Sequence, residues 1–358
     1  MEHLKLNIGP SASKLNMKSF KTSKGQRTLS TRKPIPLIID TDLAFGSDSA
    51  DIDDALAILL ALAHPEQFDV LAVTAVSGNV DGVRASANID ILLDRIGFGH
   101  IPHCASGTRP WDANFWVQSR WNAQKKSVQE REKASQTKFQ IQGQGSDLIR
   151  DILRSAPQAV TIACVGPLTN LALVLSTEPE LLSKIGLVAC MGGVHLIPGV
   201  LNGPTEFNIL ADPEAASFVF NTGIPIALFP LDVTKKQALF PEDLELWRKT
   251  PGAFMSDLAD AAHAYMYHRS KMYNEKKPFM YFHDALPIIW LLQEKYFEMR
   301  PCQISVDCSG EFTRGVTIID THVRNRKQLD HQMAWDVDAT EVLDLVMRDL
   351  ADCYGRIK

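Results

Sequence analysis

From Pro34 onward, short apolar runs alternate with longer segments in which apolar and polar residues mix. The apolar runs consist mainly of Val, Ile and Ala with little polar alternation, which is typical of strands buried on both faces of a parallel sheet. They are Leu37–Asp40, Val70–Val76, Val160–Val165, Ile185–Met191, Pro225–Pro230 and Val316–Asp320. The pattern predicts an α/β fold: a single domain with an open, doubly wound (Rossmann-like), mostly parallel sheet and extra helices.

The segments between these runs predict helices. They are Asp53–Ala63, Arg84–Ile96, Thr169–Ser176 and Pro213–Phe220. Asp212 is a favourable N-cap for the last of these, and Pro213 suits its first position. Residues 241–300 are expected to be mainly helical. The polar segment Trp111–Gln144, with its interleaved aromatic residues, does not fit the alternation, and we expect a long surface loop or a helical excursion there.

The amino-terminal residues differ from the rest of the chain. Residues 1–33 contain eight Lys or Arg residues against one acid, Glu2, and many Ser and Thr residues. We therefore expect residues 1–33 to be a basic, disordered tail and residues 34–358 to form the α/β domain. An organelle transit peptide has a similar composition and remains the less favoured alternative.

The composition of the whole chain excludes several classes of protein. A net charge of -5 over 358 residues gives no nucleic-acid footprint, and no apolar run is long enough for a membrane span. The six cysteines show no C-x-x-C pair and no zinc spacing. We expect a cytoplasmic protein in a reducing environment, with no nucleic-acid or membrane partner.

Four acids flank the junction between the first predicted strand and the first predicted helix: Asp40, Asp42, Asp53 and Asp54. Ligands of open α/β sheets bind at the carboxyl ends of strands. So many close negative charges require a cation or partial protonation, and an all-oxygen ligand set suits Ca²⁺ or Mg²⁺. A solvated helix N-cap would explain one or two of these acids, but not four.

Further polar residues follow the other predicted strands. They are Asn79, Gly166 to Asn170, Met191 to Gly193, Glu206 to Asn208, and His283 with Asp284. Each signal is weak alone, and a lone histidine is more often structural than catalytic. Because the ends of parallel strands share one edge of a sheet, we expect these residues to line a common crevice.

In this order and spacing, the residues from about Pro34 to about Met347 resemble the inosine–uridine-preferring nucleoside hydrolases. The motifs that carry the resemblance are Asp40-Thr41-Asp42, Asp53-Asp54-Ala55, Val76-Ser77-Gly78-Asn79, Gly166-Pro167-Leu168-Thr169-Asn170, Met191-Gly192-Gly193, Glu206-Phe207-Asn208, Asp212-Pro213-Glu214, Leu231-Asp232-Val233-Thr234, His283-Asp284 and Arg314-Gly315. The resemblance implies a Ca²⁺-dependent hydrolase that cleaves the N-glycosidic bond of a ribonucleoside to free base and ribose, in nucleoside salvage.

The resemblance also implies roles for single residues. Asp42, Asp54, Asp284 and the main-chain carbonyl of Val165 match the ligands of one Ca²⁺ ion. Asp42 also matches the group that takes a proton from water, and Asp40 supports it from behind. Asp53, Asn79, Met191, Asn202, Glu206 and Asn208 match groups that contact ribose. His283 matches a residue that contacts the leaving base and helps to protonate it. No organic cofactor is implied, and a homo-oligomer (dimer or tetramer) is expected.

This chain departs from the family pattern at three places. Leu43–Ile52 is a longer and more polar connection than the family's Pro-Gly segment. Asn202 is displaced from the usual position of its counterpart before Glu206. Trp111–Gln144 replaces a histidine-rich Asp-Gly-Leu-Gly loop. These changes leave open a non-catalytic, metal-dependent ribose or nucleoside binder. A haloacid-dehalogenase-like phosphatase, suggested by Asp40-x-Asp42 alone, is a third alternative.

Overall fold

The computed structural model describes residues 33–45, 51–108, 140–200, 203–322 and 331–357. Within them lies a sheet with the strand order β11-β10-β12-β7-β6-β5-β1-β2-β3-β4. The strands are β1 (Ile35–Thr41), β2 (Phe68–Ala75), β3 (His103–Ser106), β4 (Gln140–Gln144), β5 (Val160–Cys164), β6 (Ile185–Met191), β7 (Ile226–Phe229), β10 (Phe297–Val306), β11 (Thr317–Asp320) and β12 (His331–Val337). The predicted α/β fold with a mostly parallel sheet is confirmed.

The order of the strands places a topological switch point at the centre of the sheet. β1 pairs in parallel with β2 on one side and with β5 on the other. The chain runs outward from β1 through β2 and β3 to β4, and it builds the opposite half from β5 through β6 to β7. The carboxyl ends of β1 and β5 therefore border the crevice in which ligands of such sheets bind.

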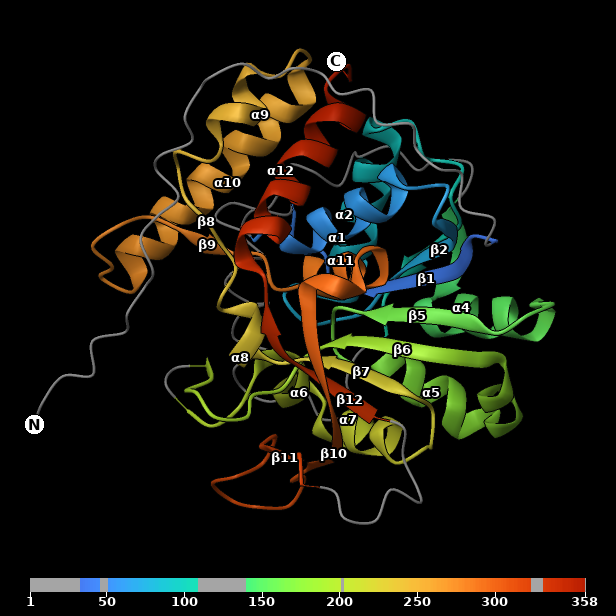
Figure 1. Cartoon of the computed structure of the whole chain (residues 1–358). Helices are drawn as coiled ribbons and strands as arrows, with labels where there is room; N and C mark the ends of the chain where they lie inside the picture. Colours follow the sequence, from blue (N-terminus) through green and yellow to red (C-terminus); the bar gives the residue numbers. More distant parts are fainter. Residues whose placement is uncertain (1–32, 46–50, 109–139, 201–202, 323–330, 358) are drawn as a thin grey trace, which may run out of the picture. The chain divides into compact units, whose positions relative to one another are not determined.

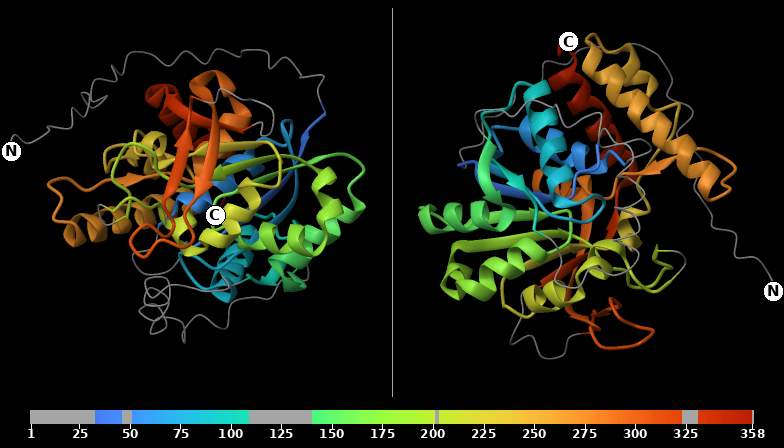
Figure 2. Two further views of the ribbon diagram at one scale, coloured as in Figure 1. Left: turned by 90° about the horizontal axis from the view of Figure 1, so that it is seen from below. Right: turned by 180° about the vertical axis from the view of Figure 1, so that it is seen from behind.

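Helices cover both faces of this sheet (Figures 1 and 2). They are α1 (Asp53–Ala63), α2 (Gly82–Arg95), α4 (Gly145–Ser155), α5 (Thr169–Thr177), α6 (Phe207–Ala211), α7 (Pro213–Phe220), α8 (Leu231–Thr234), α9 (Glu245–Lys249), α10 (Ala253–Met272), α11 (Ala285–Leu292) and α12 (Ala339–Tyr354). The short 3₁₀ helices η2 (Pro179–Lys184) and η4 (Glu294–Tyr296) and a two-stranded sheet of β8 (Ala238–Leu239) and β9 (Met280–Tyr281) complete the described elements.

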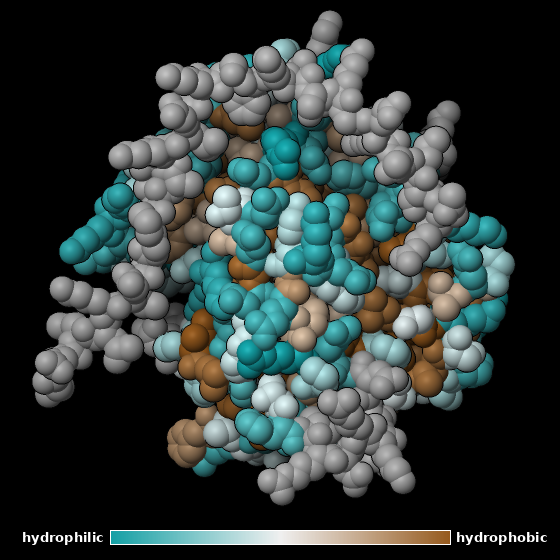
Figure 3. Space-filling model, viewed as in Figure 1, coloured by the Kyte–Doolittle hydropathy of each residue, from teal (hydrophilic) through white to brown (hydrophobic). Residues whose placement is uncertain are grey.

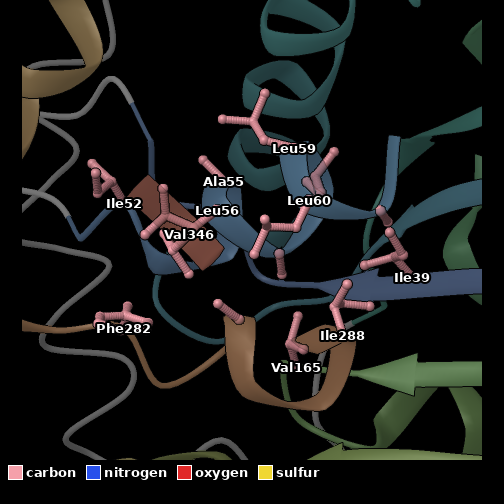
Figure 4. Packing of buried hydrophobic residues seen from close by; sticks show 14 of the residues in the cluster. Ile39, Ile52, Ala55, Leu56, Leu59, Leu60, Val165, Phe282, Ile288 and Val346 are labelled. Atoms are coloured by element: carbon pink, nitrogen blue, oxygen red, sulfur yellow. The ribbon is translucent and has the colours of Figure 1, made fainter. Parts of the chain in front are cut away.

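Two hydrophobic cores form because successive side chains of a strand point to opposite faces. Leu37 and Ile39 of β1 belong to one core, and Ile38 between them belongs to the other. The first core also contains α1, whose residues pack near Ile288 of α11 and Val346 of α12 (Figure 4). This double burial explains why the central strands read as continuous apolar runs.

The local predictions are largely confirmed. The helices at Asp53–Ala63 and Pro213–Phe220 have the predicted bounds, and the Asp212 carboxylate accepts the backbone N–H of Ala215. Five predicted parallel strands match β1, β2, β5, β6 and β7, with small shifts at their ends. Val316–Asp320 contains strand β11, but β11 is an edge strand that pairs antiparallel with β10.

Other parts of the sheet were not predicted. The strands β3, β10 and β12 have exposed positions or mixed composition, so their sequences lack a continuous apolar run. The segment Trp111–Gln144 lies mostly outside the described residues, but its end forms β4, which corrects the prediction of a loop or helix there. The predicted tail also lies outside the described residues and stays a prediction. None of the described helices is both long and apolar enough to cross a membrane.

Hydrophilic side chains cover much of the surface on the face shown in Figure 3, with hydrophobic residues scattered between them.

Candidate active site

Three buried carboxylates meet at the switch point. Asp53 and Asp54 occupy the first turn of α1, and Asp284 directly precedes α11. One oxygen from each of the three lies within 4.8 Å of the others. Both helix amino termini favour negative charge, which helps to hold the carboxylates in place. Within the described residues, this is the cluster whose oxygens could share a metal ion.

The environment of these acids penalises their charged forms. Burial and the charge of Asp42 raise the pKa of Asp54, and burial and the charge of Asp53 raise the pKa of Asp284. The hydroxyl of Thr41 donates a hydrogen bond to Asp54 Oδ1, while Oδ2 has no hydrogen-bond partner among the described residues. A divalent cation would satisfy this oxygen and relieve the repulsion, so the residues present fit a hard cation such as Ca²⁺.

Asp42 lies beside this cluster and is held by the turn after β2. Its carboxylate accepts hydrogen bonds from the backbone N–H of Asn79 and, at 3.3 Å, from the side-chain amide of Asn79. A Cβ atom on Gly78 would come within 2.0 Å of Asp42 Oδ2, so the carboxylate rests against the bare Cα of that glycine. The structure thus brings Asp42 and Asn79 together. Asp53, which was predicted to contact ribose, lies with Asp54 and Asp284 in the three-carboxylate cluster.

Asp40 lies behind these residues and links three elements. Its Oδ1 accepts hydrogen bonds from Thr74 Oγ1 of β2 at 2.6 Å and from Asn170 Nδ2 of α5 at 2.7 Å. Burial raises the pKa of Asp40 to about 7 despite these donors. The contacts add Thr74 and Asn170 to the site, and the supporting role of Asp40 stays a prediction. Asn170 belongs to the family motif Gly166 to Asn170, whereas nothing in the sequence indicated Thr74.

Three of the residues predicted to contact ribose, Met191, Glu206 and Asn208, lie together at the ends of β5 and β6. Asn208 Nδ2 donates to the carbonyl oxygens of Val165 at 2.8 Å and Met191 at 3.2 Å. The carboxylate of Glu206 caps α6 and accepts the N–H groups of Asn208 at 2.8 Å and Gly193 at 3.0 Å. Burial raises the pKa of Glu206 to about 7. Asn202 lies outside the described residues, and its predicted role stays a prediction.

His283 lies between the acid cluster and a second group of side chains, which consists of Thr234, Lys235 and Arg269. Its Nδ1 is 2.7 Å from Thr234 Oγ1 at the end of α8. Burial, followed by the positive charges of Lys235 and Arg269, lowers the pKa of His283 to about 3. The imidazole is therefore neutral near pH 7. Sequence reasoning did not select these two cations, because only the fold places α8 and the end of α10 near His283.

This combination of an α/β sheet, an acid cluster at its switch point and a neighbouring histidine defines a hydrolase site of the nucleoside hydrolase type. The family profile described as inosine-uridine preferring nucleoside hydrolase matches residues 37–344. The chain belongs to this family, and the prediction of a hydrolase that acts on N-glycosyl bonds is confirmed.

Individual proteins agree with this assignment. The chain is 31% identical over 318 residues to the pyrimidine-specific ribonucleoside hydrolase RihA of Shewanella sp. (strain MR-7), covering 88% of this chain and 96% of that protein. For RihA of Photobacterium profundum the identity is 32% over 320 residues, covering 88% and 99%. Among solved structures, a plant nucleoside hydrolase matches with a TM-score of 0.75 and 27% identity, covering 89% of this chain and 99% of that chain. A purine-preferring ribonucleoside hydrolase from Gardnerella vaginalis matches with a TM-score of 0.76 and 26% identity, with the same coverage.

Proposed function

We propose that this protein hydrolyses ribonucleosides to free base and ribose, and that it requires Ca²⁺. The observation that carries the proposal is the buried cluster of Asp53, Asp54 and Asp284 at the switch point of the sheet. One relative is named as a pyrimidine-specific ribonucleoside hydrolase and another as a purine-preferring one, which supports a nucleoside as the substrate.

The acids of the site suit the charge that develops on the sugar. As the bond between C1′ and the base nitrogen breaks, the ribose gains positive oxocarbenium character, which nearby carboxylates stabilise. Asp42, Asp54 and Asp284 would hold the cation, together with the carbonyl oxygen of Val165. Asp53 shares the cluster of Asp54 and Asp284 and would hold either the cation or the ribose. When bound, Ca²⁺ would lower the pKa of a water molecule and orient ribose hydroxyls.

Asp42 would receive a proton from the attacking water, as the resemblance to the family implies. Its carboxylate is fully buried and fixed by Asn79. The ribose contacts would come from Asn79, Asn202 and Asp53 and from Met191, Glu206 and Asn208, of which the last three lie together at the end of β6. Binding energy from these remote contacts can be used to distort the sugar toward the transition state.

The direct test is ribose release from inosine, adenosine, uridine and cytidine, with Ca²⁺ and with a chelator. We expect release that requires Ca²⁺, and no release after Asp54→Asn. Asp94→Asn, which changes an exposed acid of α2, is the matched control and should retain activity. Calorimetric binding of a nucleoside by folded, Ca²⁺-loaded protein without any ribose release would instead favour a non-catalytic binder.

We further propose a cytoplasmic homo-oligomer with a basic amino-terminal tail at residues 1–33. The resemblance to the family supports the oligomer, and free thiols at all six cysteines support a reducing compartment. Light scattering of the purified chain, fractionation of the native host and mass spectrometry of its amino terminus test these three points.

A further inference from the structure

The electrostatic environment changes sign between two neighbouring residues, His283 and Asp284. The charges that act most strongly on Asp284 are all negative, and Asp53 and Asp54 come first among them. The charges that act most strongly on His283 are both positive, from Lys235 and Arg269. The acid cluster and the two cations therefore lie within reach of the same site but act on different parts of it.

Lys235 is held in position by the loop that follows β6. The half-buried side chain of Lys235 donates from Nζ to the carbonyl oxygen of Pro198 at 2.8 Å. Lys235 directly follows Thr234, whose hydroxyl lies 2.7 Å from His283 Nδ1. Burial and the charge of Arg269 lower the pKa of Lys235, and the charges of Asp232 and Glu206 act in the opposite direction. Lys236, the next residue, instead pairs with Asp336 at 2.8 Å on the surface.

Arg269 supplies the second positive charge from the last turns of α10. Its guanidinium lies 4.2 Å from the ring centroid of Phe279 and 5.2 Å from that of Tyr281, whose ring is in turn 5.2 Å from the ring of His283. An ion pair with Glu275 at 2.6 Å offsets part of its charge. Of the two cations, Lys235 lowers the pKa of His283 more strongly.

Cleavage of an N-glycosidic bond separates charge in the direction that this arrangement favours. The bond between C1′ and the base nitrogen breaks with its electron pair on the base, the water oxygen forms the new bond to C1′, and a water proton ends on the base. Negative charge thus develops on the base while positive charge develops on the sugar. A fixed cation near the base lowers the energy of this transition state more than that of the bound nucleoside.

We propose that Lys235, supported by Arg269, stabilises the negative charge on the leaving base, so that His283 contacts the base inside a positive environment made by these two side chains. This inference rests on the proposed nucleoside hydrolase function and adds Lys235 to the residues that serve its reaction. It assigns the acids to the sugar half of the transition state and the cations to the base half.

The test compares leaving groups of different quality. Lys235→Met removes the charge but keeps an unbranched side chain. We expect it to lower kcat/KM for uridine and inosine by about 10²-fold. Hydrolysis of p-nitrophenyl riboside should change by less than about 3-fold, because nitrophenolate is stable as an anion and needs little help from a cation. Lys235→Arg should restore most of the activity, and Lys236→Met is the adjacent control.

Each outcome decides the proposal. Equal losses on nucleosides and p-nitrophenyl riboside would place Lys235 on the sugar side or in folding, and unchanged activity on both would remove it from the reaction. Either result overturns the inference while leaving the proposed function intact. If the wild-type protein with Ca²⁺ cleaves neither type of substrate, the proposed function fails first. Thermal unfolding of every variant shows whether the fold is retained.

Discussion

Gly78 has no side chain, and the carboxylate of Asp42 uses the space that one would fill. In Gly78→Ala the new Cβ would meet Asp42 Oδ2 at 2.0 Å and Pro167 Cδ at 2.8 Å. We expect Asp42 to move, because Pro167 on the loop after β5 prevents the new Cβ from moving away. Activity should fall by about 10²-fold, the usual effect of a reacting group displaced by about 1 Å.

Steady-state kinetics measure the activity of Gly78→Ala, and urea unfolding measures its stability. Gly186→Ala is the control for both. The nearest atom to a Cβ at Gly186 is Ala159 Cβ at 3.2 Å, far from the acids. Wild-type activity in Gly78→Ala would show that the position of Asp42 is not critical.

Glu206 should make the stability of the Ca²⁺-free protein depend on pH. Its folded pKa of about 7 lies above the ordinary value of 4.5, because it is buried. The folded state therefore binds the proton more tightly than the unfolded state. The resulting stabilisation is fully present below pH 4.5 and is lost as the pH rises through 7. The loss amounts to about 3 kcal/mol for a shift of this size.

Urea unfolding of the chelated protein at about pH 5 and about pH 8, on either side of the raised pKa, tests this expectation. Glu206→Gln cannot titrate, so its free energy of unfolding should fall less between the two pH values than that of the wild type. All other titrating groups are the same in both proteins, and the difference isolates Glu206. Identical slopes would contradict a raised pKa at this residue.

At the scale of elements, the described ends of the longer Leu43–Ile52 connection are fixed at the junction between β1 and α1. Leu43 and Ala44 at its start and Ile52 at its end are buried in the first core. Asp51, next to Ile52, accepts the N–H of Ile52 at 2.8 Å and turns its carboxylate back toward the start of α1. Both described ends of the connection are therefore anchored next to Asp53 and Asp54.

The N-cap of α12 offers a stability effect that should not reach the active site. The Asp338 carboxylate accepts the N–H groups of Thr340 and Glu341, both at 3.2 Å. Asp338→Ala should lower the free energy of unfolding by about 1 kcal/mol. The value of kcat/KM should not change. The lost hydrogen bonds lie at the start of α12, and α12 still packs on α1 through its apolar face.

Asp344→Ala, on the exposed face of the same helix, is the matched control and should change stability much less. Urea unfolding compares the two variants. Because Ala favours helices more than Asp does, helix propensity cannot lower the stability of either variant. If both lose the same stability, the loss of a negative charge from α12 rather than capping explains the effect of Asp338→Ala.

At the scale of the whole molecule, ion binding at the acid cluster should stabilise the entire fold. The three acids of the cluster come from α1 and from the residue before α11, which meet only in the folded chain. Calcium at about 100 times its dissociation constant should add about 2.7 kcal/mol to the free energy of unfolding. Mg²⁺ should add less, because it demands strict octahedral geometry and retains its waters.

Thermal unfolding with Ca²⁺, Mg²⁺ or a chelator measures this effect. The shift caused by Ca²⁺ should disappear in Asp54→Asn and persist in Asp94→Asn. An equal shift in Asp54→Asn would mean that the stabilising ion binds elsewhere on the protein.

The sequence by itself determined the central strands, the bounds of two helices and the residue types at the strand ends. These features depend on local physics: continuous apolar runs reflect burial on both faces, and Asp212-Pro213 encodes a helix start. The family motifs added a consistent set of predicted roles. Strands β10 and β12 escaped prediction because their stability comes from pairing with partners distant in sequence.

Only the tertiary structure decided which of the acids share one cluster and what surrounds His283. Asp284 lies 230 positions after Asp54 in the sequence, and the distance between them depends on how α11 packs on α1. The cations near His283 come from the end of α8 and from α10, whose sequences carry no sign that they face a common site. Charge interactions depend on separation in space and on burial, and both are set by the fold rather than by neighbours in the chain.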